Sequence, residues 1–337
     1  MKRTFLILLL CLPILGLAQE TRKTNRKIIY VAENGLGDGS SWSSPLGNLQ
    51  TALKKAHNGQ SIWVAAGTYF PTSSKDRTVA FQIPNGVKVL GGFAGYETSQ
   101  EERDHYSNKT ILSGNIGALE ASDNSYTVVF FKGVDNSTIL DGFTIEGGNA
   151  DKKVLESNPY SCGGGIYNDA SQKSSSPQIE NCTLQNNSAY YGAGLYNNAK
   201  GGHSSLELAY CSFISNTAKF DGGAILNEAS HGTGNIKIIY SEFFHNQAYY
   251  GAALINKVKE EGEANPLIDA VTFEENTAFM KGSPIYNLRT GEGICKPLIT
   301  RCIFTNNVES ISAPKGKISQ PPAATQKSYN IRKTYKR

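Results

Sequence analysis

The stretch Gly222-Gly223-Ala224-Ile225-Leu226-Asn227 decides the fold, because the same block returns through the second half of the chain. Each copy holds a glycine, two small residues, an aliphatic residue, an apolar residue and an asparagine. The asparagines lie 29 to 31 residues apart, and they are Asn168, Asn197, Asn227, Asn256 and Asn287. A block repeated at this period indicates a solenoid, in which each coil of the chain stacks on the one before.

A second motif has the same period. It reads aromatic or leucine, two residues, then asparagine, and the first residue is expected to point into the core. Asparagine tolerates the left-handed backbone region, and its amide can both donate and accept hydrogen bonds from coil to coil. The motif therefore predicts a structural asparagine ladder of Asn187, Asn216, Asn246, Asn276 and Asn307.

The coils are expected to be β-strands rather than helices. Their apolar residues come in short bursts, such as Ile236-Lys237-Ile238-Ile239, which are bounded by glycine and asparagine and lack helical spacing. Stacked coils form parallel sheets, and the glycine of each block fits a turn with positive φ. Residues 48–57 are the exception, because Leu49, Ala52, Leu53 and Ala56 fall on one helical face. We predict an all-β chain, a single right-handed parallel β-helix with a short N-terminal capping helix.

Two parts of the chain resemble known families. Gly222-Gly223-Ala224-Ile225 and Phe213-Ile214-Ser215-Asn216 resemble the GGAI and FxxN motifs of the polymorphic outer membrane protein repeat. Upstream, residues 62–69 and 140–145 resemble the secreted bacterial proteins with a right-handed parallel β-helix, the pectate-lyase-like fold. The resemblance implies the fold for residues 28–308 but not an activity, because the architecture serves lyases, hydrolases and adhesins alike.

The ends of the chain differ from its middle. Residues 1–18 have the charged start, apolar stretch and small-residue end of a secretory signal peptide. We expect a polar leader over residues 19–27, the β-helix over 28–308 with regular repeats over 162–308, and a basic, disordered tail over 309–337. No other segment is apolar enough to cross a membrane. The expected location is outside the cell, at the outer-membrane surface or in the periplasm.

Charge argues against nucleic acid as a partner. Residues 28–314 hold 20 Lys and Arg against 28 Asp and Glu, so the body is acidic and the basic residues gather at the ends. Nucleic-acid binding needs a basic face on the folded body. Five cysteines remain after signal cleavage, and we expect core thiols for the three that share one repeat column. The disulfide pairing of the five cysteines stays open; the five are Cys162, Cys182, Cys211, Cys295 and Cys302.

The sequence offers no catalytic or metal-binding set. Its acidic runs, 101–105 and 259–263, have the composition of solvated turns, and no pair of carboxylates emerges on adjacent coils in the column that holds Asp169 and Glu228. We therefore assign no cofactor and no metal, and leave calcium binding between coils open. The insertion at residues 151–161 is the place to look first for function, because loops on rigid scaffolds carry function.

A column of aromatic residues is the candidate binding surface. Tyr190, Tyr249 and Phe279 stand three residues past Asn187, Asn246 and Asn276, and Lys219 holds the same place after Asn216. Such an aromatic stripe can stack sugar rings. We interpret the chain as an exported, monomeric, non-catalytic binding protein of adhesin type, with a polysaccharide or cell-surface ligand. Two alternatives remain: a lyase or glycoside hydrolase acting on an acidic polysaccharide, and a structural envelope component.

Overall fold

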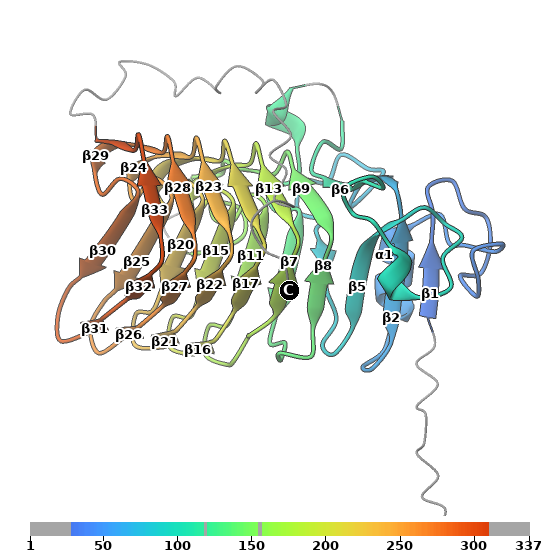
Figure 1. The fold of residues 1–337 in the computed structure, drawn as a ribbon, viewed down its shortest axis with the longest axis horizontal. Coiled ribbons are helices and arrows are strands. Elements are labelled where there is room, and N and C mark those ends of the chain that lie inside the picture. Colours follow the sequence, from blue (N-terminus) through green and yellow to red (C-terminus); the bar gives the residue numbers. More distant parts are fainter. Residues whose placement is uncertain (1–27, 118–119, 154–156, 310–337) are drawn as a thin grey trace, which may run out of the picture.

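The computed structural model describes residues 28–117, 120–153 and 157–309. These residues wind into one elongated stack of coils, with strands of successive coils lying side by side (Figure 1). Every strand pair in the named sheets is parallel, and one short α-helix interrupts the first coil. The predicted all-β parallel solenoid with a short helix is confirmed. The predicted signal segment, the leader and residues 310–337 lie outside the described residues.

Two sheets form the face nearest the viewer in Figure 1. Sheet A has nine strands, one from each coil: β1 Ile28–Val31, β2 Ser61–Ala65, β5 Lys88–Phe93, β8 Ile139–Asp141, β12 Gln178–Glu180, β17 Glu207–Ala209, β22 Lys237–Ile239, β27 Leu267–Asp269 and β32 Leu298–Thr300. Sheet B has eight: β3 Gly67–Tyr69, β6 Thr110–Ser113, β9 Phe143–Glu146, β13 Thr183–Gln185, β18 Ser212–Ile214, β23 Glu242–Phe244, β28 Thr272–Glu274 and β33 Ile303–Thr305.

Three further sheets complete the coils. Sheet C, at the back, has seven strands: β4 Phe81–Gln82, β7 Val129–Lys132, β11 Ile166–Asp169, β15 Leu195–Asn198, β20 Ile225–Glu228, β25 Leu254–Val258 and β30 Ile285–Arg289. Sheet D follows the upper edge of Figure 1: β10 Asn149–Ala150, β14 Ser188–Tyr191, β19 Thr217–Asp221, β24 Gln247–Tyr250, β29 Thr277–Lys281 and β34 Val308–Glu309. Sheet E follows the lower edge: β16 His203–Ser204, β21 Thr233–Gly234, β26 Glu263–Ala264 and β31 Ile294–Cys295. Two 3₁₀ turns, η1 Gln100–Glu102 and η2 Ala121–Asp123, lie in loops.

The helix α1, Leu49–Lys55, lies in the first coil between β1 and β2. Asn48 caps it, because the side-chain oxygen accepts a hydrogen bond from the Thr51 amide at 3.0 Å. Leu49, Ala52 and Leu53 are buried in the core. The Gln50 amide also donates to the carbonyl of Ala80, which directly precedes β4, at 2.9 Å. The helix thus lies against the terminal strand of sheet C.

Left-handed residues turn the chain at each corner. The block glycines have φ between +57° and +80°, as predicted; they are Gly163, Gly192, Gly222, Gly251 and Gly282. Between sheets B and D the left-handed residue is not the ladder asparagine but the one before it; these are Asn186, Ser215, His245, Glu275 and Asn306. The ladder asparagines therefore serve hydrogen bonding, and their neighbours make the turn.

Two asparagine ladders run through the interior. In the predicted one, the side-chain amides of Asn187, Asn216, Asn246 and Asn276 each donate both to the next asparagine oxygen and to a backbone carbonyl of the preceding coil. Asn216, for example, donates to Asn246 Oδ1 at 3.0 Å and to the Leu184 carbonyl at 2.9 Å. The block asparagines form the second ladder, in which Asn168, Asn197, Asn227, Asn256 and Asn287 are joined at 2.8 to 3.1 Å. Both ladders satisfy polar groups that lie away from water.

The core is a set of stacked apolar columns. The aromatic column predicted to face inward does so: the rings of Phe213, Phe243 and Phe273 are fully buried and stack with centroids 4.7 and 4.9 Å apart. All five cysteines of the described residues are free. In the shared column, Cys182 and Cys211 donate their thiols to carbonyls of the preceding coil, at 3.6 and 3.4 Å.

The two ends of the solenoid differ. The last coil exposes side chains whose counterparts one coil earlier are fully buried: Ile299 is 39% exposed and Phe304 50%, whereas Ile268 and Phe273 are 0% exposed. Strand β34 ends at Glu309, one residue into the predicted tail. The C-terminal end of the described chain is therefore an open cross-section of the core.

Candidate functional site

The aromatic residues predicted to bind lie on sheet D. Tyr190, Tyr249 and Phe279 form a ladder there with Phe220, at centroid distances of 5.8, 6.5 and 6.0 Å. Phe220 joins because the register of β14 and β19 shifts by one residue. The rings of Tyr190 and Phe220 stack on each other, and Lys219 Nζ lies 4.9 Å from the centre of the Tyr190 ring. Much of the ring surface is thus used within the ladder, and a binding role for it stays a prediction.

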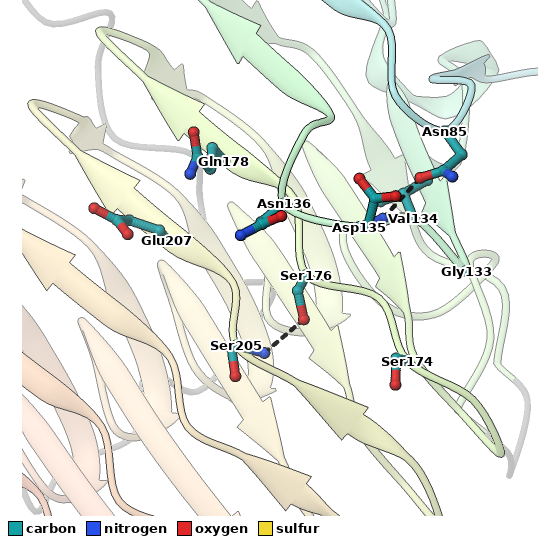
Figure 2. A pocket seen from close by; sticks show the side chains of 10 residues that line it. All are labelled: Asn85, Gly133, Val134, Asp135, Asn136, Ser174, Ser176, Gln178, Ser205 and Glu207. Atoms are coloured by element: carbon teal, nitrogen blue, oxygen red, sulfur yellow. Dashed lines mark hydrogen bonds between the residues drawn. The ribbon is translucent and has the colours of Figure 1, made fainter. Parts of the chain in front are cut away.

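A hollow of about 480 Å³ lies on the other side of the solenoid, where the chain turns from sheet C to sheet A (Figure 2). We call it the polar groove. Four successive coils line it, and most of its side chains carry amide, hydroxyl or carboxylate groups; the lining residues are Asn85, Gly133, Val134, Asp135, Asn136, Ser174, Ser176, Gln178, Ser205 and Glu207.

Local backbone structure explains where the groove forms. The connection from β7 to β8 (residues 133–138) is shorter than the next one, from β11 to β12 (residues 170–177), and sheet E begins just beyond. The groove lies at this change of length. Hydrogen bonds fix neighbouring turns: the Asp135 amide donates to Asn85 Oδ1 at 2.8 Å, and the Ser205 amide to Ser176 Oγ at 2.9 Å (Figure 2).

Beside the groove, the outer face of sheet A carries carboxylates on adjacent coils. Asp141 and Glu180 are direct partners in the register of β8 and β12, and Glu207, which lines the groove, begins the next strand. The prediction that no carboxylate pair lies on adjacent coils is therefore wrong: it rests on the column after the block asparagines, whereas these acids share another column. The signal was present, because residues 140–144 (Leu-Asp-Gly-Phe-Thr) and 179–183 (Ile-Glu-Asn-Cys-Thr) align residue by residue.

The two partners have different environments. Asp141 is nearly buried and forms an ion pair with Arg103, whose side chain is 15% exposed. It also accepts a hydrogen bond from the Asn181 amide at 2.8 Å. Glu180 has no such bonds within the described residues. Burial raises the pKa of the Glu180 carboxyl, and the charges of Asp141 and Glu207 raise it further. An unpaired carboxyl with a raised pKa is typical of a functional site.

Replacing Glu180 by glutamine is expected to stabilise the protein at neutral pH. The folded-state pKa lies above the unfolded value of about 4.3, so the folded state is penalised once the pH passes through the folded pKa. Thermal unfolding at pH 7 and pH 4 measures the effect, which should vanish at the lower pH. Glu242→Gln is the matched control, because burial also raises the pKa of Glu242, far from the groove. Equal midpoints for Glu180→Gln and wild type at pH 7 would contradict the prediction.

The described residues of the insertion, 151–153 and 157–161, do not line the groove. Residues 154–156 lie outside the described chain, but Ser157 lies over the outer face of sheet C, where its hydroxyl donates to Glu228 at 3.2 Å. Tyr196 donates to the Ser157 hydroxyl at 2.7 Å, and the Tyr167 hydroxyl to the Ser157 carbonyl at 3.1 Å. Ser157 therefore ties this part of the insertion to the outer face of sheet C.

The described part of the chain lacks both a metal-binding cluster and a membrane-spanning helix. No three His, Cys, Asp or Glu side chains there gather closely enough to hold a metal ion. Within the same residues, no helix has the length and apolar character needed to span a membrane.

Comparisons with known proteins concern the fold and the family. No curated protein sequence matches the chain. Among solved structures, the crystal structure of pectate lyase Pel9A is similar, with a TM-score of 0.43, 11% sequence identity, and coverage of 82% of this chain and 78% of that one. The family model described as protein of unknown function, DUF1565, matches residues 31–207, a range that holds the whole polar groove together with Asp141 and Glu180. The chain thus belongs to the DUF1565 family.

Proposed function

We propose that the protein is an exported, non-catalytic solenoid that binds an extended polysaccharide in the polar groove. One observation carries the proposal: four successive coils line a single groove with amides, hydroxyls and carboxylates. Sugar hydroxyls donate and accept hydrogen bonds, and these side chains supply both partners. A groove that crosses several coils suits a polymer better than a compact ligand.

The charge of the groove favours neutral or amino-sugar polymers. Asp135 and Glu207 line it, and no Lys, Arg or His does, although Lys237 Nζ forms an ion pair with Glu207 Oε1 at 2.8 Å and offsets part of the charge. Glu180 lies next to it on sheet A. A uronate polymer would bring negative charge against these carboxylates, and like charges brought together repel. An acidic polysaccharide, the substrate class of the alternative interpretation, is therefore the less favoured ligand.

The double variant Asn136→Ala, Gln178→Ala is expected to weaken binding about 30-fold, because two hydrogen bonds of about 1 kcal/mol each are lost. Both side chains line the groove. Isothermal titration with xylan, mixed-linkage glucan, chitosan oligomers, polygalacturonate and alginate measures the affinity. Tyr190→Ala, Tyr249→Ala is the parallel variant for sheet D. If only the sheet D variant loses affinity, the groove is not the site; if only polygalacturonate and alginate bind, the charge argument is wrong.

A second candidate function, glycoside hydrolysis, is favoured by Glu180. A carboxyl with a raised pKa can act as general acid, with a second carboxylate close by. Its register partner, Asp141, is held by Arg103 and Asn181. Few acceptor positions of the Asp141 carboxylate therefore remain for a water molecule or a sugar hydroxyl. Mass spectrometry of the same polymers after incubation separates the two functions. Oligosaccharide products that vanish in Glu180→Gln would establish the hydrolase; intact polymers leave binding alone.

A further inference from the structure

The corner between sheets A and B carries an unusual pair of residues. Its left-handed position is held in successive coils by Asn181, Tyr210, Tyr240, Ala270 and Arg301, with φ between +49° and +55°. Asparagine suits this backbone conformation, whereas a bulky aromatic residue is strained in it. Core packing does not demand the tyrosines, because Tyr210 is 41% exposed.

The tyrosine rings form a short exposed platform. Tyr210 and Tyr240 stack with centroids 5.2 Å apart and planes 12° apart. Behind them, the small Ala270 leaves space for Arg301, whose guanidinium lies 6.0 Å from the Tyr240 ring centre while it forms an ion pair with Asp269. The platform is thus supported from the C-terminal side.

The opposite face of Tyr210 is turned toward the coil of Glu180. The preceding residue in the column, Asn181, directs its amide to Asp141 in the coil before, at 2.8 Å, and so away from Tyr210. Glu180 directly precedes Asn181 and pairs in register with Ala209, the residue before Tyr210. The free ring face and the unpaired carboxyl therefore border the same patch of surface.

This patch continues the polar groove. Strand β17 begins with Glu207, which lines the groove, and Tyr210 follows directly after its end. Three residues of strand span roughly 10 Å. The outer face of sheet A thus joins the groove on one side to the tyrosine platform on the other, with Glu180 between them.

We propose that Tyr210 is a sugar-stacking subsite, which selects pyranose units with a flat apolar face. The inference rests on the proposed function and names the sugar class for it: β-linked gluco- or xylo-configured units, with or without an N-acetyl group. The ring takes the apolar face of the sugar. Glu180 accepts hydrogen bonds from the hydroxyls at its rim. The strained tyrosine is kept at the corner for this contact.

The test is Tyr210→Asn, which copies the residue of the preceding coil. It should raise the thermal midpoint by about 2 °C, since strain is relieved, and weaken binding of xylohexaose, cellohexaose or chitohexaose about fivefold. Tyr210→Phe should bind like wild type. Ala270→Asn, at the same corner position, is the matched control and should leave affinity unchanged.

The outcomes separate the two proposals. Tyr210→Asn with a higher midpoint and weaker binding supports the subsite. A lower midpoint shows that the ring serves packing, and unchanged affinity shows that it does not touch sugar; either overturns the inference and leaves the groove proposal standing. If wild type binds none of the polymers or hexasaccharides, the proposed function falls and the subsite with it.

Discussion

Asn216→Ala is expected to lower the free energy of unfolding by about 4 kcal/mol, because it opens a fully buried hydrogen-bond chain. The Asn216 side chain donates to the Leu184 carbonyl and to Asn246 Oδ1, and its oxygen accepts from the Asn187 backbone and side-chain amides at 3.2 and 3.0 Å. Alanine removes these bonds from the Leu184 carbonyl and the Asn187 backbone amide, whereas Asn246 Oδ1 keeps the backbone amide of residue 216 and the Asn187 side-chain amide keeps the Ile145 carbonyl. Each of the two removed bonds costs about 1–3 kcal/mol, partly relieved by water that enters the space.

Denaturant unfolding followed by far-ultraviolet circular dichroism measures the loss. Asn307→Ala provides the comparison, because Asn307 ends the same ladder in the exposed last coil and has a ladder partner on one side only. We expect it to cost about 1 kcal/mol. Similar losses of unfolding free energy at the two positions would mean that the stability supplied by the ladder does not depend on burial. The hydrogen-bond explanation of its stabilising effect would then be wrong.

Phe243→Ala is expected to destabilise the fold by about 4 kcal/mol, the range typical of a large buried aromatic residue. The Phe243 ring is fully buried and stacks between Phe213 and Phe273. Its removal leaves a cavity in the middle of the stack, and the flanking coils cannot close it because their hydrogen bonds fix the spacing between them.

The matched variant is Phe304→Ala in the same column. Its ring stacks on Phe273 at 5.2 Å but is 50% exposed, so its loss should cost about 1 kcal/mol. Chemical denaturation of both variants gives the comparison. A loss at Phe243 no larger than at Phe304 would show that the column is loosely packed and contributes little to stability.

Much of the fold could be predicted because its determinants repeat. A glycine with positive φ, such as Gly222, and an inward aromatic residue, such as Phe243, recur at one period, and each has a single physical reason to be where it is. The capping helix was predicted from its apolar face. Repetition converts weak local preferences into a clear signal.

The groove and its acids were not predicted, because they arise where the repeat is broken. The groove depends on a change in the length of the connections from sheet C to sheet A. This change leaves the spacing of the repeated motifs unaltered, so the motifs do not reveal it. Glu180 and Asp141 are partners in the register of sheet A, but the next two coils hold Ala209 and Ile239 in that column, so the acidic pair does not recur with the repeat. Phe220 joins the sheet D ladder through a one-residue bulge, and spacing alone had placed Lys219 there.

The asparagine ladders also give the solenoid a polar axis. In both, the amide nitrogen of each coil donates to the oxygen of the next: Asn187 to Asn216 and Asn216 to Asn246, for example. The side-chain dipoles therefore point the same way, with their positive ends toward the last coil, and in a dry interior such aligned dipoles reinforce one another. Any further coil stacked there must offer an acceptor to Asn287 and Asn307. The orientation of the amides thus fixes the direction in which coils can be added. A coil added in the reverse orientation would place an N–H donor against the N–H donor of the last asparagine.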